Sequence, residues 1–285
     1  MSGGFLRSMG IVCLVLAGAC VQAADLTPEQ RRDGLASLPW VKGPADVGVG
    51  DKAKLKLGDG LGFLPEKESG RFLELTGNLP SPGESILVSD TWWAAFDFAD
   101  VGYVKDDEKL DPDALLKDLK SHDEPANVER RKRGLSEMHT DGWAVPPHYD
   151  PDTKHLEWGL KLHTQDHPEP VINYTVRLLG RNGYENVILV SSPEGLDRNV
   201  AALKGVLKTF EFNAGEKYSE FKQGDRIAEF GLGALIVGGT AAALAKTGFW
   251  KTILVALAAG WKVVLGGLGI VAAGLGNLFK KKKAT

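Results

Sequence analysis

The strongest constraint on this chain is the length of its apolar segments, because a helix crosses a bilayer only when about 20 successive residues are apolar. Near the N-terminus, the apolar run 9–19 follows Arg7 and is too short to span. A positive residue before a run of this length is typical of a signal peptide. Val21 and Ala23 supply the small side chains that precede a cleavage point. We therefore expect residues 1–23 to be a signal peptide.

Both cysteines of the chain, Cys13 and Cys20, lie inside this segment. A mature protein that begins at Ala24 would have no thiol, which excludes disulfides, thiolate catalysis and cysteine-ligated metals. A lipoprotein is the alternative, because Cys20 follows the small residues 17–19.

The C-terminal end carries two further apolar stretches. Residues 230–245 are marginal for a span, whereas residues 253–279 are long enough to cross with some tilt. Lys262 interrupts the second stretch at a cost of about 2.5–3.5 kcal/mol, less if its side chain reaches the interface. Lys280–Lys283 then favour the cytoplasmic side. We expect residues 226–285 to be a membrane-associated segment and anchor with a basic tail.

The predicted topology has one span, with residues 24–225 forming an extracytoplasmic domain at the cell membrane and the C-terminus in the cytoplasm. A two-span hairpin is the alternative, and it would leave the terminal lysines outside. Small residues share one face of the second stretch, which would allow a homo-oligomer through the anchor. They are Gly266, Gly269, Ala273 and Gly276.

The charge of the chain is divided between body and tail. Residues 25–225 carry 36 acidic and 25 basic side chains, a net charge of about −11, whereas residues 226–285 carry one acid and eight bases. An acidic body argues against nucleic-acid binding, which needs clustered lysine and arginine. The bilayer and another envelope protein are the expected partners.

Alternating and helical patterns predict an α+β fold. Expected strands are 54–57, 72–75, 85–88, 92–104, 155–163, 171–179 and 187–191. Expected helices begin at Pro28 and at Pro112, cover 127–138, and run from Ser192 to Leu207. The clearest hairpin turns at Arg181-Asn182-Gly183. The order of strands, helices, strands and helix favours an antiparallel sheet with packed helices in one exported domain.

Metal binding is the first chemistry to consider. All six histidines fall between residues 122 and 167, and His155, His163 and His167 are the metal-ligand candidates. Strand alternation would place His155 and His163 on a solvated face, and no compact ligand motif is present. A metal-dependent hydrolase or a metal- or solute-sensing domain that uses region 139–167 therefore stays an alternative.

Other motifs give weaker signals. The segment 58–62 lacks the lysine of a phosphate-binding loop, and the segment 83–87 lacks the second glycine of a nucleophile elbow. We therefore expect no cofactor. Four tryptophans could line a pocket for sugars or apolar ligands, although tryptophan mostly serves cores. They are Trp92, Trp93, Trp143 and Trp158.

Several segments taken in order resemble an uncharacterised, membrane-anchored bacterial family that is known only as a domain of unknown function. The matching residues are Gly102–Asp107, Gly142-Trp143, Pro147, Tyr149-Asp150, Trp158, Asn173-Tyr174, Arg177–Arg181, Gly183, Tyr218 and Asp225. The resemblance implies an exported protein with a C-terminal anchor and supplies no catalytic residues. The order of strands and the late helix also resemble small α+β modules of the photosystem-accessory and Ran-release type, an analogy of fold alone.

The sequence thus predicts a membrane-anchored envelope protein that works as a binding or interaction module rather than as an enzyme. No motif places a nucleophile beside a base, which acyl or phosphoryl transfer would require.

Overall fold

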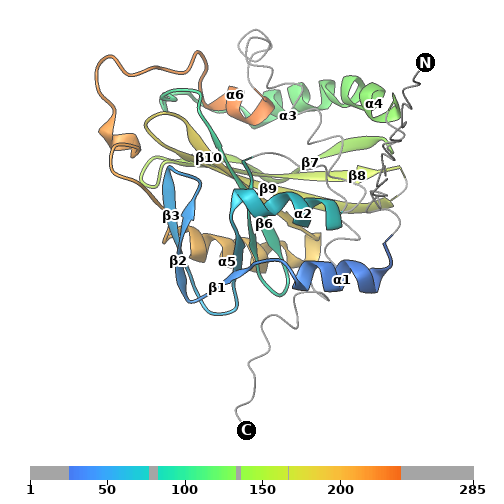
Figure 1. Cartoon of the computed structure of the whole chain (residues 1–285). Coiled ribbons are helices and arrows are strands. Elements are labelled where there is room, and N and C mark those ends of the chain that lie inside the picture. The colour runs from blue at the N-terminus through green and yellow to red at the C-terminus, as the bar shows by residue number, and fades with distance from the viewer. Residues whose placement is uncertain (1–25, 77–82, 133–135, 166, 239–285) are drawn as a thin grey trace, which may run out of the picture.

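Eight antiparallel strands form the main sheet of the computed structural model, which describes residues 26–76, 83–132, 136–165 and 167–238 (Figure 1). In spatial order they are β1 (Val41–Lys42), β4 (Gly62–Leu64), β5 (Ser85–Val88), β6 (Trp93–Ala99), β10 (Tyr184–Ser191), β9 (His167–Leu179), β8 (His155–Thr164) and β7 (Met138–Asp150). A smaller sheet has the order β11 (Glu211–Phe212), β3 (Ala53–Leu57) and β2 (Ala45–Val49). The predicted α+β class with an antiparallel sheet is confirmed.

Six helices accompany these sheets in the described residues. They are α1 (Pro28–Ala36), α2 (Glu66–Leu75), α3 (Pro112–Ser121), α4 (Asp123–Lys132), α5 (Leu196–Leu207) and α6 (Leu232–Val237), with short 3-10 turns at Pro193–Gly195 and Tyr218–Glu220. Thr27 caps α1, which begins at Pro28 as expected, since its hydroxyl accepts from the Gln30 N–H while the Gln30 side chain accepts from the Thr27 N–H.

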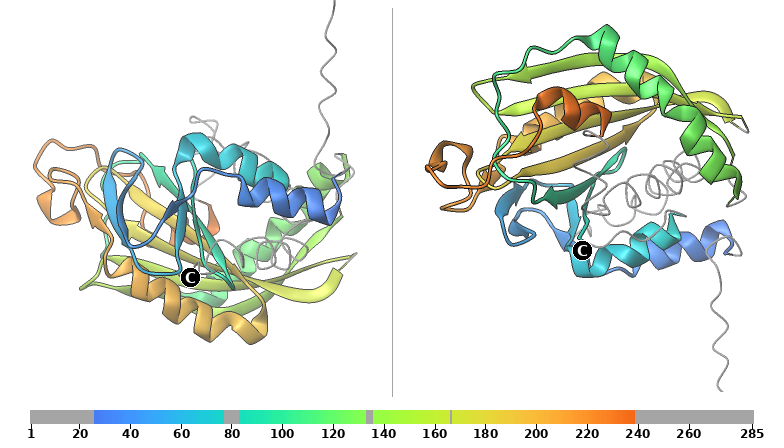
Figure 2. Two further views of the ribbon diagram at one scale, coloured as in Figure 1. Left: turned by 60° about the horizontal axis from the view of Figure 1, so that its bottom comes forward. Right: turned by 90° about the horizontal axis from the view of Figure 1, so that it is seen from above.

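Strand register shows which elements cover which face of the large sheet. Tyr174, Val176 and Leu178 of β9 point into a core that α5 and the small sheet share. The alternate β9 residues Val171 and Leu179 point to the opposite face, where they join two further clusters. There α1 and α2 cover one end and α3 and α6 the other, as the views in Figure 2 show.

The most local predictions are confirmed. The hairpin of β9 and β10 turns at residues 180–183, and α5 buries Leu203 and Leu207 in the core. β8 covers the expected strand 155–163, and α3 follows its cap at Asp111, whose carboxylate accepts from two helix N–H groups.

Three predicted elements are wrong in type or length. The run 72–75 belongs to helix α2, because Ser69, Phe72 and Leu73 have helical spacing and bury one face. β6 ends at Ala99, before Gly102 adopts a φ of 91°. α4 ends at Lys132, so Met138 begins strand β7 instead of ending a helix.

The fold continues into the first C-terminal apolar stretch. Leu232, Leu235 and Ile236 of α6 are buried in the core, and the Glu108 carboxylate accepts from the Gly233 N–H at 2.9 Å. Within the described residues, no helix is long and apolar enough to cross a membrane. The expected span at 253–279 and the signal peptide at 1–23 lie outside the described residues.

Candidate functional site

The structure separates two of the three predicted metal ligands. His155 and His163 stand at opposite ends of β8, eight residues and therefore about 27 Å apart along the strand. His167 opens β9 opposite Thr164, and its side chain lies outside the described residues. His155 and His163 therefore cannot bind one ion together.

The two histidines have different surroundings. His163 Nδ1 lies 2.8 Å from Asp141 Oδ1, and its ring stacks on His139 with centroids 5.2 Å apart. Both rings are partly exposed on the surface of β7 and β8. No group of three or more His, Cys, Asp or Glu side chains in the described part of the chain is placed to hold a metal ion.

His155, which strand alternation had assigned to a solvated face, belongs to a cluster centred on Glu157, two residues further along β8. Glu157 is 5% exposed, and Lys204 of α5 contacts its carboxylate. Its carboxylate lies 2.5 Å from Lys204 Nζ and 3.3 Å from His148 Nε2, and it accepts a 2.5 Å hydrogen bond from the Tyr174 hydroxyl. His155 Nδ1 lies 4.0 Å away.

Burial and these contacts shift the pKa values of two groups in the cluster. Burial lowers the pKa of His155, although nearby Glu157 acts in the opposite direction. Burial first, and then the bond to Glu157, raise the pKa of Tyr174. The Lys204 ammonium already lies where a cation would bind Glu157. The cluster therefore joins α5 to three strands, and sequence reasoning missed it because the helix is distant in the chain.

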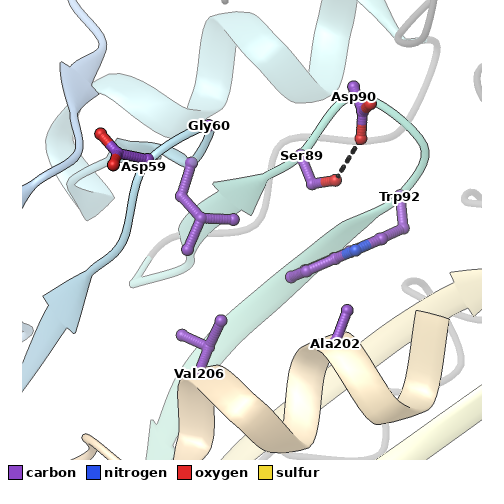
Figure 3. A pocket seen from close by; sticks show the side chains of 8 residues that line it. Asp59, Gly60, Ser89, Asp90, Trp92, Ala202 and Val206 are labelled. Carbon is purple, nitrogen blue, oxygen red and sulfur yellow. Dashed lines mark hydrogen bonds between the residues drawn. The ribbon is translucent and has the colours of Figure 1, made fainter. Parts of the chain in front are cut away.

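A pocket of about 380 Å³ lies on the same face of the sheet, beside α5 (Figure 3). Its apolar lining consists of the Trp92 indole with Leu61, Ala202 and Val206. The polar lining residues are Asp59, Gly60, Ser89 and Asp90. Figure 3 shows the Trp92 ring above α5, with the Asp59 and Asp90 loops on either side. A volume of this size suits a small ligand or one side chain of a partner.

Two tight loops hold the pocket in shape. Gly60 has a φ of 77°, which a side chain would disfavour, in the turn between β3 and β4. The Ser89 N–H donates to the Trp92 carbonyl at 2.9 Å, while the Ser89 hydroxyl donates to Asp90 at 3.0 Å. Both carboxylates are on exposed residues, so the mouth of the pocket is acidic.

The residues that carry the family resemblance lie mostly at the other end of the sheet. Asp106 accepts hydrogen bonds from Tyr149 at 2.7 Å and from Lys154 at 2.9 Å. Burial alone would raise the pKa of Asp106, but these bonds outweigh it and lower the pKa. These two hydrogen bonds attach the 102–108 segment to the sheet.

A second set of contacts that attaches a loop to the sheet involves Arg181 and Asp225. The guanidinium binds the carboxylate with two hydrogen bonds of 2.7 Å, and this pairing lowers the pKa of Asp225 to about 2. The Tyr218 hydroxyl donates to the Val104 carbonyl at 2.8 Å. These contacts tie the segment that leads to α6 onto the β9–β10 turn.

The structure defines an α+β domain built on a large antiparallel sheet with a smaller three-stranded sheet beside it. The chain belongs to the family described as "Protein of unknown function (DUF2167)", whose model matches residues 41–269. No curated protein matches the chain.

Among solved structures, the chain is similar to the solution structure of cyanobacterial PsbP (CyanoP) from Synechocystis sp. PCC 6803. The two share 12% sequence identity with a TM-score of 0.36, over 63% of this chain and 95% of that chain.

Proposed function

We propose that the protein is a membrane-anchored envelope module that binds a partner protein through the pocket beside α5. The ligand is a segment of the partner that presents a cationic side chain next to an apolar one. The observation that carries this proposal is the composition of the pocket: an apolar lining of Trp92, Leu61 and Val206 under a mouth with Asp59 and Asp90.

The two parts of the pocket select different parts of the ligand. Burying an apolar side chain against tryptophan gains about 25 cal/mol per Å² of area removed from water. A lysine or arginine at the mouth would meet two carboxylates, which give orientation and specificity more than affinity. The net charge of about −11 over residues 25–225 would also attract a basic partner at low salt.

Tethering to the membrane supports the same function. An anchor at residues 253–279, closed by Lys280–Lys283, would hold the domain close to other membrane-bound proteins. Confinement raises the effective concentration of such partners without any new contact, so a modest pocket would suffice.

Topology is testable with two single cysteines in the cysteine-free mature chain, S121C and A284C. Ser121 is exposed at the end of α3, so a membrane-impermeant thiol reagent added to intact cells should label it. We expect labelling at position 121 and none at 284, because the terminal lysines favour the cytoplasm. Labelling at both positions would indicate the two-span hairpin, and labelling at neither would contradict export.

The pocket is testable by filling it. Ala202 is an exposed lining residue of α5, so A202W should occupy the pocket without disturbing the core. Ala201 is the exposed neighbour that does not line the pocket, and A201W is the matched control. Calorimetric titration of the full chain with a short peptide containing adjacent lysine and leucine should show at least about tenfold weaker binding for A202W alone.

Two results would oppose this assignment. Equal affinity of A202W and A201W for the lysine peptide would place binding elsewhere. A wild-type protein that prefers a matched peptide with glutamate in place of lysine would show that the acidic mouth does not select the ligand.

A further inference from the structure

Two histidines face each other at the edge of the main sheet, where β7 pairs with β8. His139 and His163 are direct partners in the strand register, so their side chains point to the same face of the sheet. Their rings lie side by side, with centroids 5.2 Å apart and planes inclined by 29°. The side chain of His139 is 42% exposed and that of His163 is 31% exposed. Solvent and dissolved ions therefore reach both imidazoles.

A carboxylate fixes the position of the hydrogen on one of these rings. Asp141 Oδ1 lies 2.8 Å from His163 Nδ1. A carboxylate accepts hydrogen bonds and does not donate them, so Nδ1 of the neutral ring carries the hydrogen and Nε2 keeps its lone pair. Proteins orient metal-binding histidines in this way, because the carboxylate holds the ring in place and strengthens the other nitrogen as a ligand.

A β-bulge brings Asp141 to this position. The register of β7 against β8 shifts between Thr140, which pairs with Leu162, and Gly142, which pairs with Lys161. Asp141 is therefore the extra residue of the bulge and has no partner directly across the strand pair. Bulges of this kind redirect a side chain, and here the carboxylate reaches the ring on the neighbouring strand.

The charges on this face are compatible with a bound cation. Asp141 forms no ion pair with a lysine or arginine in the described chain, so its charge is open to a cation at the histidine. Glu137 adds a carboxylate oxygen 3.7 Å from His139 Nε2, although Arg131 binds the other oxygen of Glu137 at 2.6 Å. Lys161 on the same face is exposed, so its ammonium group can extend into water.

We propose that His139 and His163 together bind one divalent transition-metal ion on the surface of β7 and β8. Metal–nitrogen bonds of about 2.0–2.1 Å place two ligand nitrogens about 3–4 Å apart. The rings are already side by side, and the ring torsion of histidine is soft, so a rotation of either ring brings the nitrogens to this separation. Imidazole suits copper, nickel and zinc rather than magnesium or calcium, and copper binds most tightly of these ions.

This site has two protein ligands among the described residues. A catalytic zinc site has three, so water would fill the remaining positions around the ion. Two ligands also agree with the finding that no three metal-binding side chains are grouped in the described chain. The open positions make the ion exchangeable and accessible to a further ligand. The site shares no residue with the α5 pocket, so this inference is independent of the proposed function.

The test is titration of the full chain, purified without a histidine tag, with Cu²⁺ and with Zn²⁺. H139Q and H163Q should each weaken copper binding at least about tenfold, because each variant leaves a single imidazole. H148Q is the matched control. His148 is also an exposed histidine of β7 beside a carboxylate, but Lys204 already neutralises that carboxylate, Glu157. H148Q should therefore leave the copper affinity unchanged, and zinc should bind wild type more weakly than copper does.

Asp141 is tested separately, as the residue that positions His163. D141A should lower the copper affinity about tenfold or more. D141N should lower it less, because the amide oxygen still accepts the hydrogen of His163 Nδ1. The variants at 139, 141 and 163 should keep the unfolding midpoint of wild type without metal, since all three side chains are partly exposed.

The electron paramagnetic resonance spectrum of the copper complex gives an independent measure. Coupling to two imidazole nitrogens in wild type, reduced to one in H139Q and in H163Q, supports the proposal. Absence of copper binding up to about 1 mM overturns it. Equal affinity of wild type and both variants, or an equal loss in H148Q, also overturns it, because the copper would then be an adventitious ion elsewhere. Magnesium binding as tight as copper would assign the site to the carboxylates instead.

Discussion

Replacing Gly183 with alanine is expected to destabilise the fold by about 3 kcal/mol or more. A Cβ atom at this position would lie 1.9 Å from the Ala99 carbonyl oxygen and 3.0 Å from its carbon. Backbone atoms cannot move aside as the end of a flexible side chain can. The clash would therefore force apart β6 and β10, which pair at Tyr184 and Ala99.

The matched control is Gly205 on the exposed side of α5. A Cβ there meets nothing within 4 Å, so Gly205→Ala should raise stability by about 0.5–1 kcal/mol through helix propensity and reduced chain entropy. Urea unfolding followed by circular dichroism would measure both variants. Similar small effects at the two positions would contradict the close approach of Gly183 to β6.

The same hairpin illustrates what the sequence can predict. The turn around Asn182 and Gly183 lies between two alternating runs, and all of that information is local in the chain. α5 was equally predictable, because the cap at Ser192 and the stripe ending at Leu207 lie within one short segment. Such local agreement of pattern and turn chemistry specified the antiparallel α+β class.

Errors arose where a short pattern fits two structures. The sequence Phe72-Leu73-Glu74-Leu75 alternates as a strand does, yet Ser69 and Phe72 also fit a helix that follows Pro65. Packing against Trp40 and Trp93 decides for the helix, and those contacts are distant in the chain.

The candidate sites were less predictable than the fold because they are assembled from distant segments. The α5 pocket takes residues from 59–61, from 89–92 and from α5. Glu157 and His155 lie two residues apart on one face of β8, but no local pattern could reveal that Lys204 of α5 contacts Glu157 there.

Stability in the neutral to mildly acidic range should depend strongly on Glu185 of β10. This side chain is 2% exposed, and burial, with the nearby charges of Asp97 and Glu66, raises its pKa well above 4.5. The folded protein therefore holds a proton that the unfolded chain releases. Stability should rise as the pH falls through the folded pKa of Glu185 toward 4.5, at up to about 1.4 kcal/mol per pH unit.

Glu185→Gln tests this dependence, because glutamine imitates the protonated carboxyl. The variant should be more stable than wild type at neutral pH, and the difference should shrink as the pH approaches 4.5. His155 has the opposite effect on stability. Burial lowers its pKa from 6.5, so the folded protein favours the neutral imidazole, and the stability that this residue contributes is lost as the pH falls below 6.5. The wild-type and variant curves share this effect, so their difference isolates Glu185.

The measurement is urea unfolding at several pH values, with Glu194→Gln as the control at an exposed glutamate beside α5. The control should follow wild type throughout. A Glu185→Gln variant that is less stable than wild type at neutral pH, with an unchanged slope, would show that the Glu185 carboxylate is stabilised in its charged form. The burial of this carboxyl between β6 and β9 would then need a cationic or hydrogen-bonding partner, whereas a shrinking difference would establish that the folded sheet itself raises its proton affinity.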